Sequence, residues 1–502
     1  MIPESIRQLK PKEYGSCKIR AVSGHYYVYE VHSRWDKERK RAVKENGRCL
    51  GKITERDGFI PNRYGRSLLS PAGVETGKRM TVLSYGAYEL LTQLSPEVGD
   101  SLREFFPDIY RELRALALLR LVDGVGPRLM HPTFLDSYMS ELAPDLAMSE
   151  VSVREFVRRL GRQTDRIESF MRASILPGAD LVFDGTHFFA QVRDSLSQKG
   201  YNPDRKKRKQ IRLLYIFDQS TYRPQFYQVL QGSAVDKTAF IDIVKASGCQ
   251  KCTVIGDKGF YSKRNASALM DSGLDLSYIL PLNSNTALVK EEWLENPDRS
   301  KFDGAFAYHD RPIYFHKEAL GNNGNWIYTY YDPLKALEKE ARQMTRQTIK
   351  TDQTIFTDLA FLSIRSGYFS FVSNLDTGSQ QVYLTYKKRG SIETCFDYLK
   401  NVVHAGPAYA HTDEGIRGWA FLNHLSLLYF YGLVDALRSK KLDARYTPAD
   451  VILLSKHVYA VRCGAGPYEV AHVQKKTMEL LEQLGINLTA PLQIESPSSP
   501  ST

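Results

Sequence analysis

The order of short apolar segments between residues 180 and 285 constrains the fold of this chain more than any other feature of its sequence. Three strand-like segments follow one another, and two more then alternate with helix-like segments. In chain order the strand-like segments read ADLVFDGTHFF, KQIRLLYIFDQST, RPQFYQVLQGS, CTVIG and LSYILPL, and the helix-like ones read DKTAFIDIVKASG and KRNASALMDSG. A hairpin series followed by alternating strands and helices is typical of a mixed sheet. We therefore predict an α/β fold class for this part of the chain.

Two aspartates stand where such strands are expected to end. Asp184 follows LVF and precedes Gly185, and Asp257 follows CTVIG and precedes KGFYS. The carboxyl ends of strands in α/β sheets border the crevice where ligands bind. An aspartate after a strand is also a common turn or cap residue. The position makes both aspartates candidates for a site without identifying the site.

The segment YKKRGSIETCFDYLK, residues 386–400, predicts a helix with an ordered polar stripe. At about 100° per residue, four polar side chains fall within about 60° of one another, and apolar residues fill the adjoining sector. The four are Tyr386, Arg389, Glu393 and Lys400. An ordinary amphipathic helix with a solvated charged face would show the same pattern. The alternative is that the stripe presents its charges to a ligand.

The carboxylates of Asp184, Asp257 and Glu393 would together suit hard divalent cations. Mg²⁺ and Mn²⁺ prefer oxygen ligands, and two such ions can serve an in-line phosphoryl displacement. Arg389 would then hold a phosphate through two hydrogen bonds, and Lys400 would neutralise another. The formal net charge of +11 favours a polyanionic partner but does not identify one. The combination predicts two Mg²⁺ or Mn²⁺ ions per active site and a nucleic-acid strand held against them.

Together these motifs resemble a known family. DGT after one strand, DKGFYS after a later strand and then Tyr-x2-Arg-x3-Glu-x6-Lys resemble the DDE transposases of bacterial and archaeal insertion sequences. The last motif is similar to the Y-R-E-K signature of the insertion-sequence-4 type, the Tn-five-like branch, and its spacing is met without a gap error. A long separation between Asp257 and Glu393 is also typical of that branch. Lys258 departs from the pattern, because Arg is common after the second aspartate, but the positive charge is kept.

The resemblance implies an RNase H-like mixed-sheet catalytic core, interrupted by a mostly β insertion at about 286–376. It implies that Asp184, Asp257 and Glu393 bind the metal ions of a two-metal-ion polynucleotidyl transferase and endonuclease. Water would cut a phosphodiester at an element end, and the freed 3′-OH would attack a second strand, in cut-and-paste DNA transposition. Members of this branch commonly pass through a hairpin DNA end with a flipped base.

DNA contacts follow partly from the resemblance and partly from charge. Tyr386 and Arg389 would bind the phosphate near the flipped base, and Trp326 in GNNGNWIYTY is the candidate for stacking on that base unless it is a core residue. The basic run RKKRK at 205–209 is either a phosphate-contacting hairpin tip or a solvated turn. The predicted DNA-binding residues are Tyr386, Arg389, Lys400, Lys258, Trp326, Arg205, Lys206, Lys207 and Arg208.

Composition also changes along the chain in a way that predicts its organisation. The first 75 residues are β-rich and basic, with Asn46-Gly47 and Asp57-Gly58 as expected hairpin turns. This part either recognises the terminal repeats of the element or is a structural domain that is merely basic. Its candidate contact residues are Arg39, Lys40, Arg41 and Lys44. The predicted organisation is an N-terminal β-rich basic domain at 1–75, a helical region at 80–178, the catalytic core at 179–437, a C-terminal helical region at 438–490 and a disordered tail at 491–502.

Two rival functions stay open from the sequence alone: an RNase H-like nuclease without strand transfer, and a catalytically silent, domesticated DNA-binding protein. The expected partners are double-stranded DNA, as terminal inverted repeats and target, and a second copy of the chain in a homodimer. The longest apolar run, Trp419 to Val434, is shorter than the roughly 20 residues that span a bilayer, so we expect a buried helix in which Asn423 and His424 are hydrogen-bonded. Six cysteines are too few for a disulfide scaffold, so we predict a cytoplasmic, nucleoid-associated protein and no membrane partner.

Overall fold

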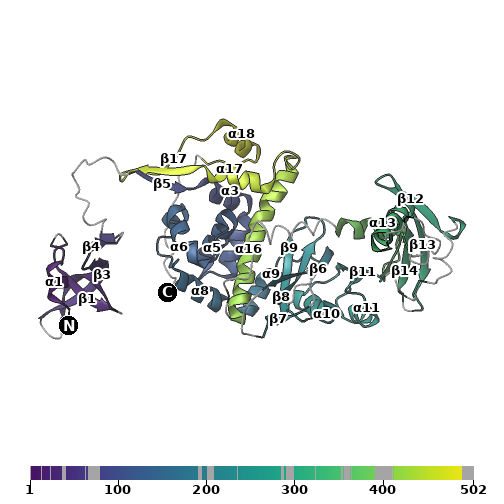
Figure 1. Cartoon of the computed structure of the whole chain (residues 1–502), viewed down its shortest axis with the longest axis horizontal. Coiled ribbons are helices and arrows are strands. Elements are labelled where there is room, and N and C mark those ends of the chain that lie inside the picture. Colours follow the sequence, from purple (N-terminus) through teal and green to yellow (C-terminus); the bar gives the residue numbers. More distant parts are fainter. Residues whose placement is uncertain are drawn as a thin grey trace. The chain divides into compact units, whose positions relative to one another are not determined.

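The computed structural model divides the chain into two compact units, Met1–Arg79 and Met80–Thr502, and Figure 1 labels many of their elements. It describes residues 2–488 except 13, 23, 37–40, 63, 66–79, 190–194, 201–207, 235, 284–285, 287, 290–298, 323, 352–353, 355–361, 363–364, 390–409 and 411. Side chains are also left undescribed at 33–46, 236–238 and 299.

The N-terminal unit is an antiparallel four-stranded sheet with the order β1-β2-β3-β4. Its elements are α1 (Glu4–Gln8), β1 (Cys17–Val22), β2 (His25–Asp36), β3 (Arg41–Thr54) and β4 (Gly58–Pro61). A small hydrophobic core of its own, which includes Ile6, Val28 and Leu50, holds α1 against the sheet. The strand-rich character predicted for this part of the chain is therefore observed.

One of the two turns predicted in this unit is wrong. Asn46 and Gly47 lie inside β3, beside an irregularity in the β2–β3 register. A Cβ atom on Gly47 would lie 2.9 Å from Cβ of Glu30 on the partner strand, so the close approach of β2 favours glycine there. The β2–β3 connection instead falls at 37–40, outside the described residues. The second predicted turn is confirmed, because Gly58 has a φ of +71° where β4 begins.

Helices form most of the second unit before its central sheet. They are α3 (Gly86–Leu94), α4 (Pro96–Phe105), α5 (Tyr110–Asp123), α6 (Pro127–Asp136), α7 (Met139–Leu142), α8 (Glu150–Leu160) and α9 (Thr164–Arg172). The C-terminal elements are α17 (Pro448–Lys456), β16 (Tyr459–Cys463), β17 (Glu469–Val470) and α18 (Lys475–Gln483). Because β16 pairs with β5 (Met80–Ser84) and α17 packs on α3, both ends of this unit share one core.

The central sheet contains the strands predicted between residues 180 and 285. β6 (Asp180–Phe189), β8 (Lys209–Asp218) and β9 (Pro224–Gln231) are antiparallel neighbours, and the short β7 (Gln198–Lys199) also pairs with β8. β10 (Thr253–Ile255) is parallel to β6, and β11 (Ser277–Pro281) is parallel to β10. The helices α10 (Asp236–Ser247) and α11 (Lys263–Met270) precede these last two strands. The prediction of a mixed α/β fold is confirmed.

The β-rich stretch predicted at about 286–376 extends this same sheet. Past β11 the order continues through β15 (Tyr368–Ser373), β14 (Trp326–Tyr331), β13 (Arg311–Ala319) and β12 (Gly304–Tyr308), all antiparallel. The 3-10 turn η1 (Arg299–Lys301) precedes β12, α13 (Pro333–Thr351) follows β14 and contacts β13, and α14 (Ser379–Lys387) follows β15. The outer strands are therefore tied to the core by backbone hydrogen bonds between β15 and β11.

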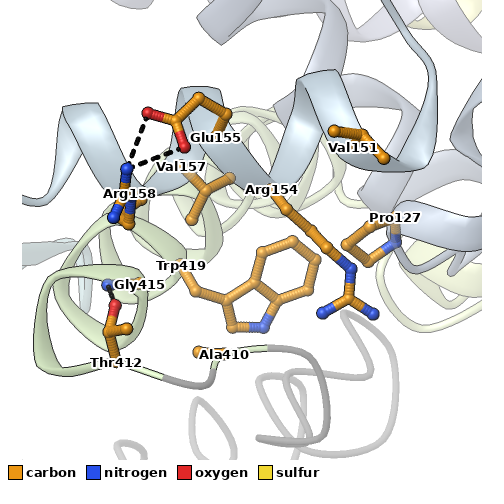
Figure 2. A pocket seen from close by; sticks show the side chains of 10 residues that line it. All are labelled: Pro127, Val151, Arg154, Glu155, Val157, Arg158, Ala410, Thr412, Gly415 and Trp419. Carbon is orange, nitrogen blue, oxygen red and sulfur yellow. Dashed lines mark hydrogen bonds and ion pairs between the residues drawn. The ribbon is translucent and has the colours of Figure 1, made fainter.

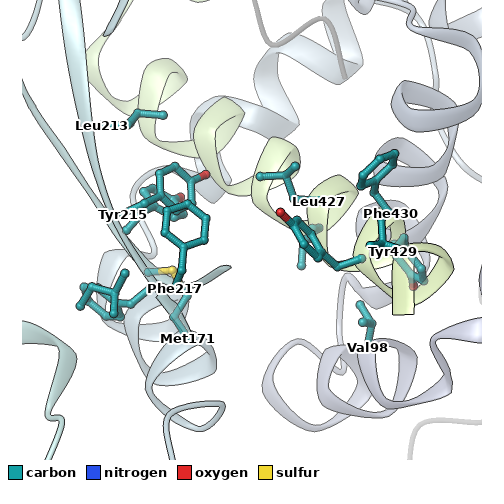
Figure 3. Packing of buried hydrophobic residues seen from close by; sticks show 14 of the residues in the cluster. Val98, Met171, Leu213, Tyr215, Phe217, Leu427, Tyr429 and Phe430 are labelled. Carbon is teal, nitrogen blue, oxygen red and sulfur yellow. The ribbon is translucent and has the colours of Figure 1, made fainter. Parts of the chain in front are cut away.

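The helix α16 (Asp413–Ser439) runs through the core of the second unit. It packs against α3, α5 and α8 and touches β9, and Figure 1 shows it beside α5. Leu427 and Phe430 of α16 belong to the same buried cluster as Tyr215 and Phe217 of β8 (Figure 3). Among the described residues, α16 is the one helix long and apolar enough to cross a membrane, but 83% of its apolar window is buried inside the protein. The predicted buried helix is thus observed.

The two polar residues in the middle of α16 are accommodated differently. Asn423 Oδ1 accepts a hydrogen bond of 2.8 Å from Nε of Arg120, whose guanidinium lies 3.8 Å from the ring centroid of Trp419. His424 Nδ1 has no hydrogen-bond partner within the described part of the chain, so the prediction fails for this atom. The ring of Tyr227 lies 5.3 Å from the imidazole, and burial lowers the pKa of His424 to about 3.

This histidine predicts an acid-sensitive core. Because the pKa of His424 is lowered in the folded state, the unfolded chain binds the extra proton between about pH 6.5 and about pH 3. We expect the wild-type chain to lose about 1.4 kcal/mol of unfolding free energy per pH unit in that window, relative to His424→Phe. Urea unfolding at pH 7, 6 and 5 measures the difference. The matched control is His472→Phe at an exposed position; an equal pH dependence in wild type and His424→Phe would contradict the prediction.

Candidate active site

The register between β6 and β10 places Asp184 and Asp257 level with each other. Val182 of β6 pairs with Ile255 of the parallel strand β10, and each aspartate follows its paired residue by two positions. Side chains two residues apart along an extended chain point to the same face. Both carboxylates therefore reach the same place on the sheet, as the sequence predicts.

The position of Asp184 within its strand differs from the prediction. β6 continues to Phe189, and Asp184 pairs with Tyr215 of β8, so this aspartate lies in the middle of a strand. The strand that ends is β10, which stops at Ile255 two residues before Asp257. β6 stays extended because β8 supplies a hydrogen-bonding partner along its whole length. The two aspartates meet where the short β10 ends beside the longer β6.

The described helix that carries Tyr386 is shorter than the predicted 386–400 segment. α14 ends at Lys387, and Lys388 keeps right-handed helical angles of φ −59° and ψ −22°. Tyr386 therefore lies in the last turn of α14 and Arg389 directly after it. The other two positions of the polar stripe fall in 390–409, outside the described residues, so their place on one stripe stays a prediction.

Buried contacts fix both ends of α14 against the sheet. The hydroxyl of Tyr330 donates a 2.6 Å hydrogen bond to the carbonyl of Ser379, at the first turn. At the last turn, Nε2 of the buried Gln219 donates a 2.5 Å hydrogen bond to the carbonyl of Thr385. The ring of Tyr386 packs on Phe371 of β15, with centroids 4.3 Å apart. These contacts, which the sequence does not reveal, deliver Tyr386 and Arg389 to the aspartates.

Arg389 joins the two aspartates through one guanidinium group. Its Nη2 lies 3.0 Å from Oδ2 of Asp184, and its Nη1 lies 3.4 Å from Oδ1 of Asp257. The side chains of Arg389 and Asp184 are only 14% and 15% exposed, whereas that of Asp257 is 45% exposed. Arg389 Nε has no hydrogen-bond partner within the described residues. Three charged residues far apart in the sequence thus form one partly buried cluster.

Burial controls the ionisation of this cluster. It raises the pKa of Asp184, while Arg389 and the Gly185 N–H oppose that rise and the nearby Asp257 adds to it. The Gly185 N–H donates 2.8 Å to Oδ1 of Asp184. Burial also raises the pKa of Tyr386, so its phenol stays a hydrogen-bond donor at neutral pH. The cluster therefore combines two converging carboxylates, one guanidinium and one neutral phenol.

The donor set at this place fits a hard divalent cation. Asp184 and Asp257 already direct carboxylate oxygens toward a shared positive group, and carboxylate oxygen is the donor that Mg²⁺ and Mn²⁺ prefer. The third predicted ligand, Glu393, lies outside the described residues. Within those residues no cluster of three metal-ligating side chains is found.

Three other predicted DNA-binding residues can be placed. Lys258 is exposed beside the cluster, and its backbone N–H donates 2.7 Å to Oδ1 of Asp257. Arg208 is exposed just before β8, with its guanidinium 6.0 Å from the ring of Phe189. Trp326 begins β14 and is partly buried, with Nζ of Lys317 4.3 Å from its ring centroid. Of these three, the structure brings only Lys258 next to the two aspartates.

The remaining predicted contacts cannot be placed. Their side chains lie outside the described residues, and they are Arg205, Lys206, Lys207 and Lys400 in the second unit and Arg39, Lys40, Arg41 and Lys44 in the first. Their roles stay predictions.

A cavity of about 550 Å³ adjoins the cluster and is absent from the sequence predictions. Lys258 and Lys387 line it, and each directly follows a residue of the cluster, Asp257 or Tyr386. The opposite wall comes from α13, whose cations Lys335, Lys339 and Arg342 repeat every three or four residues. That helical spacing indicates a basic face on a helix from the sequence alone, but the sequence does not show which surface this face borders.

A second cavity, of about 270 Å³, lies between α8 and α16. Figure 2 shows the Trp419 indole facing residues of α8, with Arg154 beside it. Its arginines are engaged, because Arg154 pairs with Glu150 at 2.8 Å and Arg158 with its neighbour Glu155. None of the predicted site residues lines this cavity, so the carboxylate cluster is the candidate active site.

Comparison with known proteins identifies the family of this chain. The profile of the family described as Transposase DDE domain matches residues 177–429, which contain both aspartates, α14 and the outer strands. The chain therefore belongs to the DDE transposase family. Among solved structures it is similar to a piggyBac transposase in a synaptic complex with hairpin DNA, with 12% identity and a TM-score of 0.42 over 74% of this chain and 78% of that chain. A search of curated proteins gave no match.

The bridging guanidinium predicts a pH-dependent stability defect in Arg389→Ala. Removing it leaves two carboxylates facing each other, which we expect to cost about 1–3 kcal/mol at pH 7, between the values for surface and buried pairs. The variant's Asp184 would take up a proton more readily in the folded state, so the defect should shrink as pH falls. Urea unfolding at pH 7 and pH 4.5 measures both effects. Lys388→Ala, which removes an exposed neighbouring charge, is the control; equal losses in both variants would contradict the assignment.

Proposed function

We propose that this protein is a metal-dependent DNA transposase that cuts and rejoins the ends of a mobile element. The observation that carries the proposal is the convergence of Asp184 and Asp257 on the guanidinium of Arg389. The strand order β9-β8-β6-β10-β11, with three antiparallel strands followed by two parallel ones, supports an RNase H-like core. Membership of the DDE transposase family supports DNA as the substrate.

Asp184 and Asp257, with Glu393 as the proposed third ligand, would hold two Mg²⁺ or Mn²⁺ ions. The chemistry that such ions supply when bound is activation of an attacking oxygen and stabilisation of the leaving oxygen in an in-line displacement. Each carboxylate accepts a hydrogen bond from the N–H of the next residue, but Asp184 is largely buried, whereas Asp257 is half exposed at the rim. This difference makes Asp184 the rigid ligand and Asp257 the one nearer to incoming substrate.

Arg389 and Tyr386 would position a substrate phosphate beside the carboxylates. Binding of cations by the aspartates would release Nη1 and Nη2 of Arg389, and a guanidinium can then hold a phosphate with two parallel hydrogen bonds. The phenol of Tyr386, kept protonated by burial, can donate to the same phosphate. Packing of Tyr386 on Phe371 limits its movement and so fixes where that phosphate binds.

In the proposed reaction, water attacks a phosphodiester at an element end, which leaves a 3′-OH on the element and a 5′-phosphate on the flanking DNA. The 3′-OH then attacks a phosphodiester of the target strand and displaces its 3′ oxygen. The Y-R-E-K spacing supports the insertion-sequence-4 type, in which the end passes through a hairpin and Trp326 would stack on a flipped base. We further propose that the N-terminal sheet contacts the terminal inverted repeats, that Arg205–Arg208 contact phosphate, and that two copies assemble on DNA.

The test is incubation of the full chain with Mg²⁺, a labelled element end joined to flanking DNA, and a target plasmid. The DNA comes from the sequence that surrounds the coding gene, where inverted repeats are expected. Joined product supports the proposal. Nicks without joining would instead establish the nuclease, and binding without cleavage in Mg²⁺ or Mn²⁺ would establish a silent DNA-binding protein.

A substitution at the buried ligand separates catalysis from binding. We expect Asp184→Ala to reduce Mg²⁺-dependent cleavage by at least about 10³-fold, because one metal ligand is lost, while binding of the same DNA in EDTA changes less than about threefold. Gel assays of cleavage and fluorescence anisotropy measure the two quantities. Asp180→Ala, four residues earlier in β6, is the matched control and should cleave normally. Full activity in Asp184→Ala would remove that residue from the site.

A further inference from the structure

The cavity beside the carboxylate cluster has the composition of an anion-binding surface. It measures about 550 Å³ and is walled by α13, α14, the β12–β13 turn and the start of β15. Seven cationic side chains line it against two carboxylates. Both carboxylates, Asp332 and Glu338, are paired with the same residue, Arg311. The other cations that line it are Lys258, Lys335, Lys339, Arg342, Arg365 and Lys387. Of these, Arg365 donates a hydrogen bond to the carbonyl of Thr286, so the two carboxylates of the cavity leave most of its positive charge unbalanced.

Lys387, at the end of α14, is a partly buried cation of the cavity wall. Burial lowers the pKa of Lys387, and the nearby Lys335 lowers it further. Its ammonium lies over the rings of Tyr308, Phe369 and Tyr383, at 5.8, 5.5 and 5.2 Å from their centroids. Aromatic faces compensate a cation only in part. Like charges gathered in a half-buried cavity are stabilised when an anion enters it.

The cationic wall continues along α13 beyond the cavity. Basic residues repeat along one side of the helix at positions that fall within about 80° of one another at 100° per residue. They are Lys335, Lys339, Arg342, Arg346 and Lys350, all exposed. The stripe is about 22 Å long at 1.5 Å per residue, which matches several successive phosphates of one DNA strand, each of which takes up about 3.4 Å of the duplex axis. A single small anion would fill the cavity but leave this stripe unused.

The cavity adjoins the candidate active site through two pairs of adjacent residues. Asp257 and Tyr386 belong to the carboxylate cluster, while Lys258 and Lys387, one position further along, line the cavity. A strand whose phosphate lies at the cluster therefore reaches the cavity within one or two nucleotides. The partly exposed rings of Tyr308, Tyr368 and Phe369 in the wall suit a nucleic acid better than an anionic lipid surface, because bases stack on aromatic rings.

We propose that the cavity and the basic stripe of α13 form a phosphate-tracking groove for the DNA that runs on from the cleavage point. This proposal rests on the proposed function, because it assumes that DNA occupies the carboxylate cluster. The groove binds the strand through its backbone, so its contribution to affinity is independent of sequence and sensitive to salt. It explains why the outer strands share the core sheet, since that continuity holds α13 at a fixed place beside the site.

The test is the salt dependence of DNA binding by Lys339→Gln/Arg342→Gln in the full chain. Binding of a fluorescent random-sequence duplex is followed in EDTA by anisotropy at several NaCl concentrations. Each lost phosphate contact lowers the slope of log K against log salt by about 0.9, so we expect the double variant to lose about 1.8. Lys339→Arg/Arg342→Lys keeps both charges and should keep the wild-type slope. The matched control Lys440→Gln/Lys476→Gln removes two exposed charges elsewhere and should lose less than about 0.3.

Each further outcome decides the proposal. A slope equal to wild type, or an equal loss in the control variant, would overturn it. So would loss of binding to vesicles containing anionic lipid without any change in DNA binding. The cleavage assay on wild type and Asp184→Ala is run in parallel to separate the two proposals. If the proposed function is wrong, the two proteins do not differ in cleavage. If only the groove is wrong, that difference remains, but the salt slope of the α13 variant equals that of wild type. Thermal unfolding of every variant confirms that each remains folded.

Discussion

The parallel pairing of β6 with β10 is the constraint on which the candidate site depends. It sets Val182 opposite Ile255 and so carries Asp184 and Asp257 to the same level of the sheet. Two carboxylates that approach each other in a partly buried place repel, and the structure balances that repulsion with the guanidinium of Arg389. The hydrogen bond from Gln219 to the last turn of α14 places that guanidinium, so the sheet and the helix depend on each other.

Continuity of the central sheet has a second consequence. Because β15 pairs with β11, the strands β12–β14 and the helix α13 are an extension of the core. An appended domain would leave a basic helix free to move relative to the carboxylates, whereas a shared sheet fixes it. In two pairs of adjacent residues, Asp257 with Lys258 and Tyr386 with Lys387, the neighbouring side chains then have different roles. One residue of each pair belongs to the proposed reaction centre, and the next belongs to the proposed groove.

The buried cluster around α16 shows what the rest of the second unit contributes. Helices from the first half of this unit and strands of the central sheet pack on the same long apolar helix, so the scaffold behind the site forms one core. Within it, Arg120 is stabilised by Asn423 and by the face of Trp419, while His424 stays neutral through burial. Polar residues are thus retained in the core either through a specific partner or by giving up their charge.

By itself the sequence determined the mixed α/β class, the buried helix and the choice of both aspartates as candidate site residues, because these depend on apolar periodicity and on the position of polar residues after strands. Only the tertiary structure decided that Asp184 lies within β6, because β8 keeps that strand extended. It also decided that Arg389 contacts both aspartates, and that Lys258 and Lys387 share a cavity with α13. Those contacts join segments from 31 residues apart, as between Asp184 and Tyr215, to 205 apart, as between Asp184 and Arg389, and their geometry depends on strand register and sheet order. Strand register and sheet order are set by backbone pairing across the sheet, so no local sequence pattern reveals them.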